Sequence, residues 1–176
     1  MISITSAPLS TGASWTTSGN AISFSTPNAI VGDPAATRSG ILNIIYDVDA
    51  GAGSAINQVL ANLGAVTMGS GQINFIEQVF ELDSMGNEVG GAIGTATHNF
   101  TPMSSGNWSG ATNVFAPKRY LRIKKSFVMT ASPDTPALDL AALAINNQSV
   151  AMVVPEPASI LAIGLAGVAF LARRKK

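Results

Sequence analysis

The chain has 176 residues, which is enough for one domain with a core of its own plus an appendage. Charged residues make up only 11% of it, against roughly 25% in typical soluble domains. Cysteine is absent, which excludes disulfides and thiolate metal sites. Residues 1–157 hold ten acidic and six basic residues, a net charge of −4, and residues 173–176 supply the balancing +4. The acidic body argues against nucleic acid as a partner.

Residues 1–150 are rich in Ser, Thr, Gly, Asn and Ala, and short strand-like runs alternate with turn-forming clusters. This pattern predicts an all-β domain, a β-sandwich or jelly roll. The predicted strands are 40–48, 72–83, 88–98, 119–131, 138–145 and 148–154. The turn at 83–91 should join the second and third of these into a hairpin. In the strand 119–131, the residues expected to face the core are Leu121, Ile123, Phe127 and Met129.

One short helix is predicted at residues 54–64. Its apolar residues follow an i, i+3, i+4, i+7 spacing: Ile56, Val59, Leu60 and Leu63. Ser54 stands where an N-cap is expected and Gly64 stands where a C-terminal glycine is expected.

Just before this helix, residues 47–58 partly resemble a calcium-binding loop. Asp47 and Asp49 fit its first and third positions, but Gly51, Ala52 and Gln58 depart from the pattern. The two aspartates are therefore weak metal candidates, and the alternative is that they are ordinary turn residues.

No catalytic constellation stands out. His98 is the only histidine, and no nucleophile motif accompanies it, so we expect a strand residue. Glu77 and Glu81 would lie about 13 Å apart on a strand, too far for glycoside hydrolysis. Glu81 and Asp83 would lie about 6.6 Å apart, but next to a turn and facing water. We therefore expect a protein that is not an enzyme and needs no cofactor.

The most distinctive feature of the body is basic. Lys118, Tyr120, Arg122 and Lys124 should share one face of a strand, and with Trp108, predicted to be exposed in a loop, they form a candidate ligand patch for an acidic polysaccharide. The alternative is a solvated face whose bases pair across strands with Glu77, Glu81 and Asp83. Trp15 is expected in the core.

The C-terminal segment is a separate object. Ala158–Ala172 is an uncharged run of fifteen residues, about 22 Å long as a helix, which is short for a 30 Å bilayer core but can be extended by snorkelling bases. We predict a transmembrane helix at 158–172, with a buried core helix as the alternative. Its basic anchor comprises Arg173, Arg174, Lys175 and Lys176, which should stay cytoplasmic and place the body outside the cytoplasm. The first fifteen residues lack the features of an export signal, so we expect that signal to lie upstream of Met1.

The order of Pro155, Glu156 and Pro157, then an apolar run, then a basic cluster resembles the PEP-CTERM sorting signal of Gram-negative bacteria. Two prolines hold this tag extended, as a protease cleft requires. The resemblance implies export, transient anchoring in the inner membrane, and processing near Pro155, Glu156 and Pro157 by an exosortase. It also implies display at the cell surface or in an extracellular exopolysaccharide or biofilm matrix.

Together these features predict two parts, an exported β-sandwich domain at 1–153 and a sorting signal at 154–176. The expected function is non-enzymatic surface or matrix display, with exosortase and the inner membrane as partners. The alternative is a carbohydrate-binding module that recognises extracellular polysaccharide.

Overall fold

The computed structural model describes residues 2–7, 9, 12–33, 37–132 and 138–153. The predicted sorting signal at 154–176, with its motif, apolar run and basic tail, lies outside the described residues. Within them, no helix is long and apolar enough to cross a membrane. The strands are β1 (Ile2–Ala7), β2 (Ser14–Ser18), β3 (Ala21–Ser25), β4 (Ile30–Gly32), β5 (Ser39–Asp49), β6 (Ala55–Met68), β7 (Gln72–Glu81), β8 (Gly94–Phe100), β9 (Gly106–Lys118), β10 (Tyr120–Thr130) and β11 (Leu140–Val153).

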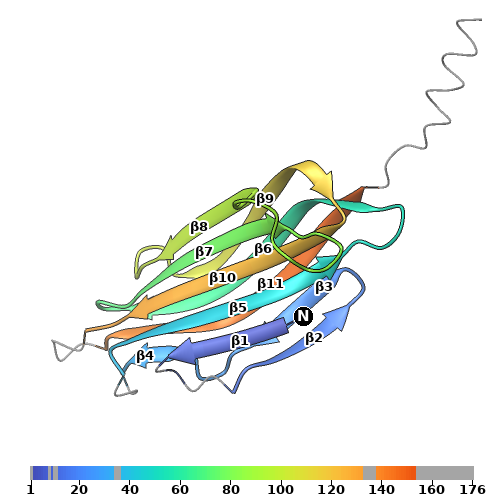
Figure 1. Cartoon of the computed structure of the whole chain (residues 1–176). Coiled ribbons are helices and arrows are strands. Elements are labelled where there is room, and N and C mark those ends of the chain that lie inside the picture. Colours follow the sequence, from blue (N-terminus) through green and yellow to red (C-terminus); the bar gives the residue numbers. More distant parts are fainter. Residues whose placement is uncertain (1, 8, 10–11, 34–36, 133–137, 154–176) are drawn as a thin grey trace, which may run out of the picture.

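These strands form two packed antiparallel sheets, which confirms the predicted all-β sandwich (Figure 1). One sheet has the order β1-β5-β10-β7-β8, and the other has the order β2-β3-β11-β6-β9, with β4 also pairing with β11. Alternate side chains of the inner strands meet between the sheets, as the pleat of a strand requires. The four predicted core residues of β10 are fully buried there.

The predicted helix at 54–64 is wrong, because this segment is part of strand β6. Val59, Ala61 and Leu63 alternate inward, whereas Ile56 is out of phase with them and is still fully buried. The register of β6 shifts between Ile56 and Gln58 against both neighbouring strands. This irregularity moves the inward face by one residue. The resulting spacing of apolar residues resembles that of a helix, and pairing on both sides of β6 decides the outcome.

The two predicted final strands are one strand. β11 continues through Asn146 and Asn147, where the sequence indicated a break, and pairs with β6 along its length.

The predicted hairpin is confirmed, since β7 pairs with β8 from Ile73↔Phe100 to Val79↔Gly94.

Gly32, at the end of β4, lies close to Asp139 just before β11 and to Ala131 just after β10. Its φ is +89°, and a Cβ there would collide with the backbone oxygen of Asp139 and lie 2.7 Å from Ala131 Cβ. Gly19 also has a positive φ, +57°, but a Cβ there would meet nothing within 4 Å. Substitutions at the two glycines therefore separate the destabilisation caused by the backbone conformation from the destabilisation caused by crowding of the added Cβ.

We expect Gly32→Ala to lower the free energy of unfolding by about 2–5 kcal/mol, because left-handed strain and overpacking add. The matched control Gly19→Ala should lose only about 1–2 kcal/mol, from the backbone alone. Chemical denaturation of both variants measures the difference. Equal losses would show that the contact with Asp139 and Ala131 does not constrain the fold.

Candidate functional site

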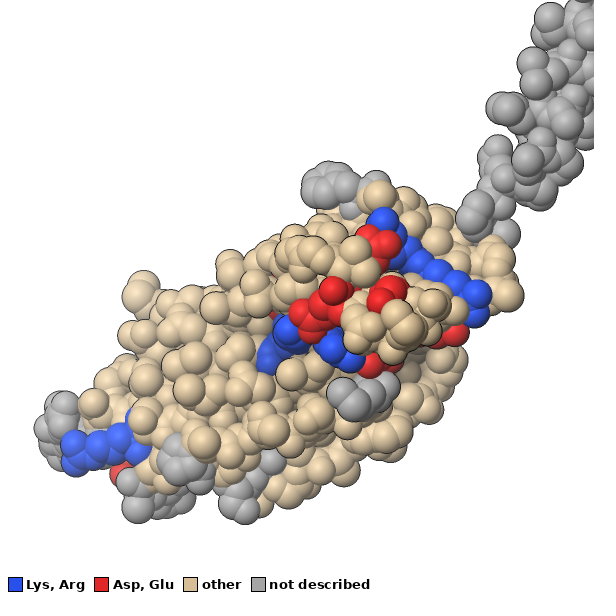
Figure 2. All heavy atoms as spheres, viewed as in Figure 1, with Lys and Arg blue, Asp and Glu red and all other residues tan. Residues whose placement is uncertain are grey.

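The predicted basic patch lies on β10 and at the end of β9, and its charges are paired. Figure 2 shows basic and acidic side chains gathered together toward one end of the visible face. The ion pairs are Lys118–Glu81 at 2.7 Å, Arg119–Asp49 at 2.9 Å, Arg122–Asp47 at 2.7 Å and Lys124–Glu88 at 2.8 Å. This surface therefore does not present bare positive charge to an acidic ligand.

Arg122 is the best held of these bases. Its guanidinium donates two hydrogen bonds to the Asp47 carboxylate, at 2.7 and 2.9 Å, and also contacts Glu88 at 3.3 Å. Such two-pronged pairs fix geometry better than single contacts. Hydrogen bonding from Arg122 lowers the pKa of Asp47, and hydrogen bonding from Lys124 lowers the pKa of Glu88.

The acidic partners differ from those predicted. Of the three expected carboxylates, only Glu81 pairs with the basic patch. Glu77 points into the core, and Asp83 accepts backbone hydrogen bonds from Met85 and Asn87 within its own turn. Aspartates at the end of β5 take their place, because β5 is the other neighbour of β10.

The two weak metal candidates, Asp47 and Asp49, each bind an arginine. Asp49 also accepts a hydrogen bond from the Gly51 amide at 2.8 Å, as in an ordinary turn. Across the part of the chain that the structure describes, no three His, Cys, Asp or Glu side chains are grouped so that they could hold a metal ion.

Trp15 was predicted to be buried and Trp108 to be exposed, and the structure shows the reverse tendency. Trp15 is 48% exposed on β2, so its expected core position is wrong. Trp108 lies on strand β9, not in a loop, and packs partly buried against the core. Its indole stacks on His98 at 4.9 Å and meets Phe75 edge-on at 5.6 Å. Trp108 therefore closes one side of the sandwich.

A buried ion pair occupies the core. Lys125 Nζ lies 2.9 Å from Glu77 Oε2, and both side chains are fully buried. Thr112 donates to the other Glu77 oxygen at 2.7 Å, and the Phe75 ring centroid is 4.8 Å from the ammonium. Burial lowers the pKa of Lys125 to about 8, although Glu77 opposes the shift. The sequence predicted the inward positions of Ile123 and Phe127 on either side of Lys125, but not that Lys125 itself is buried with them.

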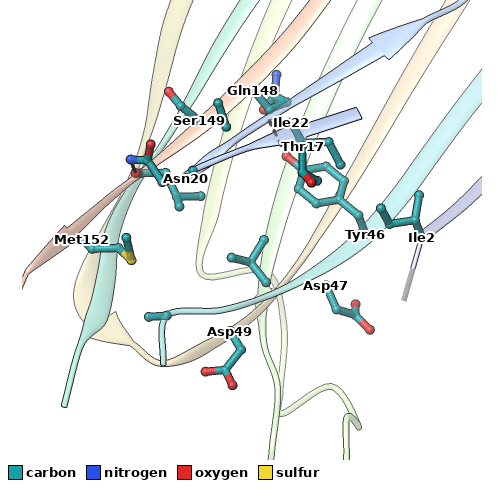
Figure 3. Close-up of a pocket in the computed structure, with 15 residues that line it drawn as sticks. Ile2, Thr17, Asn20, Ile22, Tyr46, Asp47, Asp49, Gln148, Ser149 and Met152 are labelled. Atoms are coloured by element: carbon teal, nitrogen blue, oxygen red, sulfur yellow. Dashed lines mark hydrogen bonds between the residues drawn. The ribbon is translucent and has the colours of Figure 1, made fainter. Parts of the chain in front are cut away.

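A pocket of about 350 Å³ opens at the end of the sandwich where β5 and β11 finish (Figure 3). Tyr46, Thr17 and Asn20 are among its lining residues, together with Ile22 and Met152. The Tyr46 hydroxyl donates to Gln148 at 3.2 Å, and the Asn20 amide donates to the Val150 carbonyl at 2.7 Å. The lining thus combines apolar side chains with polar ones, among them Asp47 and Asp49. No pattern in the sequence predicts this pocket, because its residues come from four distant segments.

The comparison with protein families concerns the end of the chain. The model described as the PEP-CTERM protein-sorting motif matches residues 153–176. The chain therefore carries this sorting motif, which confirms the resemblance found from the sequence. No curated protein matches the chain.

Three of the solved structures to which the chain is similar are all distant from it. A carbohydrate-binding module, TmCBM61, solved with β-1,4-galactotriose, is 10% identical at a TM-score of 0.41, over 85% of this chain and 88% of that one. The CBM22-1 xylan-binding domain of Paenibacillus barcinonensis Xyn10C is 14% identical at 0.33, over 77% and 85%. The enzymatically active domain of Bacteriophage CBA120 tailspike protein 4 is 13% identical at 0.41, over 86% of this chain but 19% of that one. Similarities this distant say nothing about what this chain binds.

The buried pair can be tested by a double-mutant cycle. Lys125→Met or Glu77→Leu alone should each cost about 3–5 kcal/mol of unfolding free energy, because each leaves an unpaired buried charge. The double variant should be more stable than either single variant, since no charge then remains. Urea denaturation gives all four values.

The exposed pair Lys124–Glu88 is the matched control. The cycle of Lys124→Met and Glu88→Leu should show a coupling of at most about 1 kcal/mol, because solvent screens this pair. If the losses of unfolding free energy in Lys125→Met and Glu77→Leu simply add in the double variant, the two buried side chains do not stabilise one another.

Proposed function

We propose that this chain is a non-enzymatic, exported β-sandwich protein that an exosortase processes at its C-terminal sorting signal, for display at the cell surface or in the extracellular matrix. The observation that carries the proposal is the sorting-motif match over residues 153–176. In this proposal the sandwich is the cargo and the last residues are its address.

The three parts of the signal have separate roles. Pro155, Glu156 and Pro157 form the extended tag that the enzyme recognises, since proline removes backbone donors and opposes helix formation. The apolar run 158–172 is the temporary anchor in the inner membrane. The basic residues 173–176 hold this anchor with its end in the cytoplasm.

The ion pairs of the sandwich support a non-enzymatic role. Catalytic acids and bases need perturbed pKa values and an open position beside a substrate. Here Glu77 is enclosed with Lys125, and Glu81 binds Lys118 at the end of its strand. Both carboxylates are occupied by ion pairs, and neither lies open to a substrate.

Processing is tested with an epitope fused after Lys176. In a host with an active exosortase, the mature protein should lose this epitope, whereas a variant with Pro155, Glu156 and Pro157 all changed to Ala should retain it. Immunoblots of secreted and membrane fractions measure the outcome. The same host without its exosortase is the control and should retain the epitope. Secretion of intact protein that still carries the epitope would contradict the proposal.

A second candidate function is binding of extracellular polysaccharide, and the pocket of about 350 Å³ favours it. A lining of apolar and polar side chains suits a sugar, which has apolar faces and peripheral hydroxyls. We place the glycan in this pocket and not on the predicted patch built on Trp108 and Tyr120. In that patch Trp108 packs against His98, and the bases around Tyr120 are paired with acidic side chains.

Substitutions at Thr17 and Thr16, which are neighbours on β2, can test whether binding occurs in the pocket or elsewhere on the surface. Both side chains are exposed, but Thr17 lines the pocket and Thr16 does not. If the pocket binds glycan, Thr17→Val should weaken binding on a glycan array by about tenfold, the effect of one lost hydrogen bond. Thr16→Val should leave binding unchanged. An array without any binding to the wild type would exclude this second function.

A further inference from the structure

The turn between β9 and β10 lies at the end of the sandwich where the sorting signal begins. Met152 of β11 pairs with Ile56 of β6, and Ile56 pairs in turn with Lys118 of β9. Two strand spacings therefore separate Met152 from Lys118, about 10 Å. The Arg119 carbonyl accepts from the Ala50 amide at 3.0 Å, and both Ala50 and Met152 line the pocket at this end.

The link between this end and the predicted anchor is short. Only residues 154–157 separate Val153, the last residue of β11, from Ala158, the first residue of the apolar run. Five residue steps span at most about 18 Å when fully extended. If residues 158–172 lie in the membrane, this end of the sandwich must stay within that distance of the membrane surface.

The side chains at this turn suit a phospholipid surface. Lys118 and Arg119 are partly exposed, at 32% and 42% of their side-chain area. The Arg119 guanidinium lies over the Tyr120 ring, 4.7 Å from its centroid. Basic and tyrosine side chains are the residues that gather at membrane interfaces, since each has an apolar body and a polar end. Arginine in addition binds phosphate through two parallel hydrogen bonds.

We propose that the Lys118–Arg119–Tyr120 turn contacts phospholipid headgroups while the chain is anchored, so that the sandwich stands on the membrane by this end. The proposal rests on the anchored stage of the proposed function. On the membrane, lipid phosphate oxygens would replace Asp49 as the partner of Arg119 and Glu81 as the partner of Lys118. The sorting tag would then lie between the folded body and the bilayer during processing.

Because Arg119 and Lys118 are already paired with acidic side chains, we expect this turn to contact lipid only while the anchor holds it near the membrane. Asp49 and Glu81 already neutralise Arg119 and Lys118, so long-range attraction to the membrane is weak. A short tether raises the local concentration of headgroups and makes a weak contact effective. Lipid therefore fits this turn better than a free acidic ligand does.

The chain has no cysteine, so one introduced cysteine gives a single labelling position. We would label full-length Ala52→Cys, at the turn after β5, and full-length Ser39→Cys, at the start of β5, with a fluorophore. Both proteins are inserted into phosphatidylethanolamine–phosphatidylglycerol vesicles that carry a headgroup-attached nitroxide quencher. The label at position 52 should be strongly quenched and the label at position 39 should not.

Lys118→Gln together with Arg119→Gln should then release the quenching at position 52. At about 1 kcal/mol per basic side chain near an anionic membrane, the ratio of docked to undocked protein should fall by up to about 30-fold. Arg38→Gln, on the segment leading into β5, is the matched control and should change nothing. Thermal melts confirm that the variants remain folded.

The other outcomes overturn the contact. Quenching at position 52 that survives the double substitution would mean that the tether alone holds the domain near the bilayer. Quenching that requires added exosortase would make the enzyme, not lipid, the partner of this turn. A full-length chain that does not float with vesicles would contradict the anchor of the proposed function, and the contact would fail with it. Flotation with equal quenching at both positions would contradict the contact alone.

Discussion

The pairing of β11 with β6 is the constraint on which the rest of the structure depends. β11 holds three strands of its sheet, since β3, β4 and β6 all pair with it. It also runs the length of the sandwich and ends at Val153, the first residue of the sorting-motif match. The same strand therefore completes the core and sets the point from which the C-terminal segment leaves the folded body (Figure 1). A shift in its register would disturb the core and move the exit point together.

Charge is used in two ways in a chain that has little of it. At the surface, pairs such as Arg119–Asp49 contribute little stability each, because solvent screens them. In the core, the Lys125–Glu77 pair links β10 to β7 and is fully desolvated. Such a pair is weak evidence for stability, but removing one partner is costly. Because Lys125 must meet Glu77, the buried pair also disfavours a one-residue slip between β10 and β7, which would put the two side chains on opposite faces of the sheet.

The sequence predicts the all-β class, the 72–98 hairpin and the inward face of β10, because these depend on local alternation and turn residues. It fails at β6, where a register irregularity gives Ile56, Val59 and Leu63 the spacing of a helix. It fails at Trp15 and Trp108, because whether a strand residue is covered depends on which strand lies opposite. The pocket could not be predicted, since Thr17, Tyr46 and Met152 become neighbours only through the sheet topology. The sorting signal could be read directly, because its elements follow one another along the chain.

The position of the charges is consistent with the proposal that the sandwich is the cargo and the C-terminal segment is its address. Most described ion pairs lie where β5, β7 and β10 meet at one end, near the exit of β11 (Figure 2). That end must face the membrane closely if the anchor forms, because residues 154–157 are too few to hold it far away. A purely apolar end would be drawn into the bilayer, and a strongly anionic end would be repelled by anionic lipids. An end of paired charges avoids both, so the same ion pairs that hold β10 in place also suit a domain that touches the membrane and is later released from it.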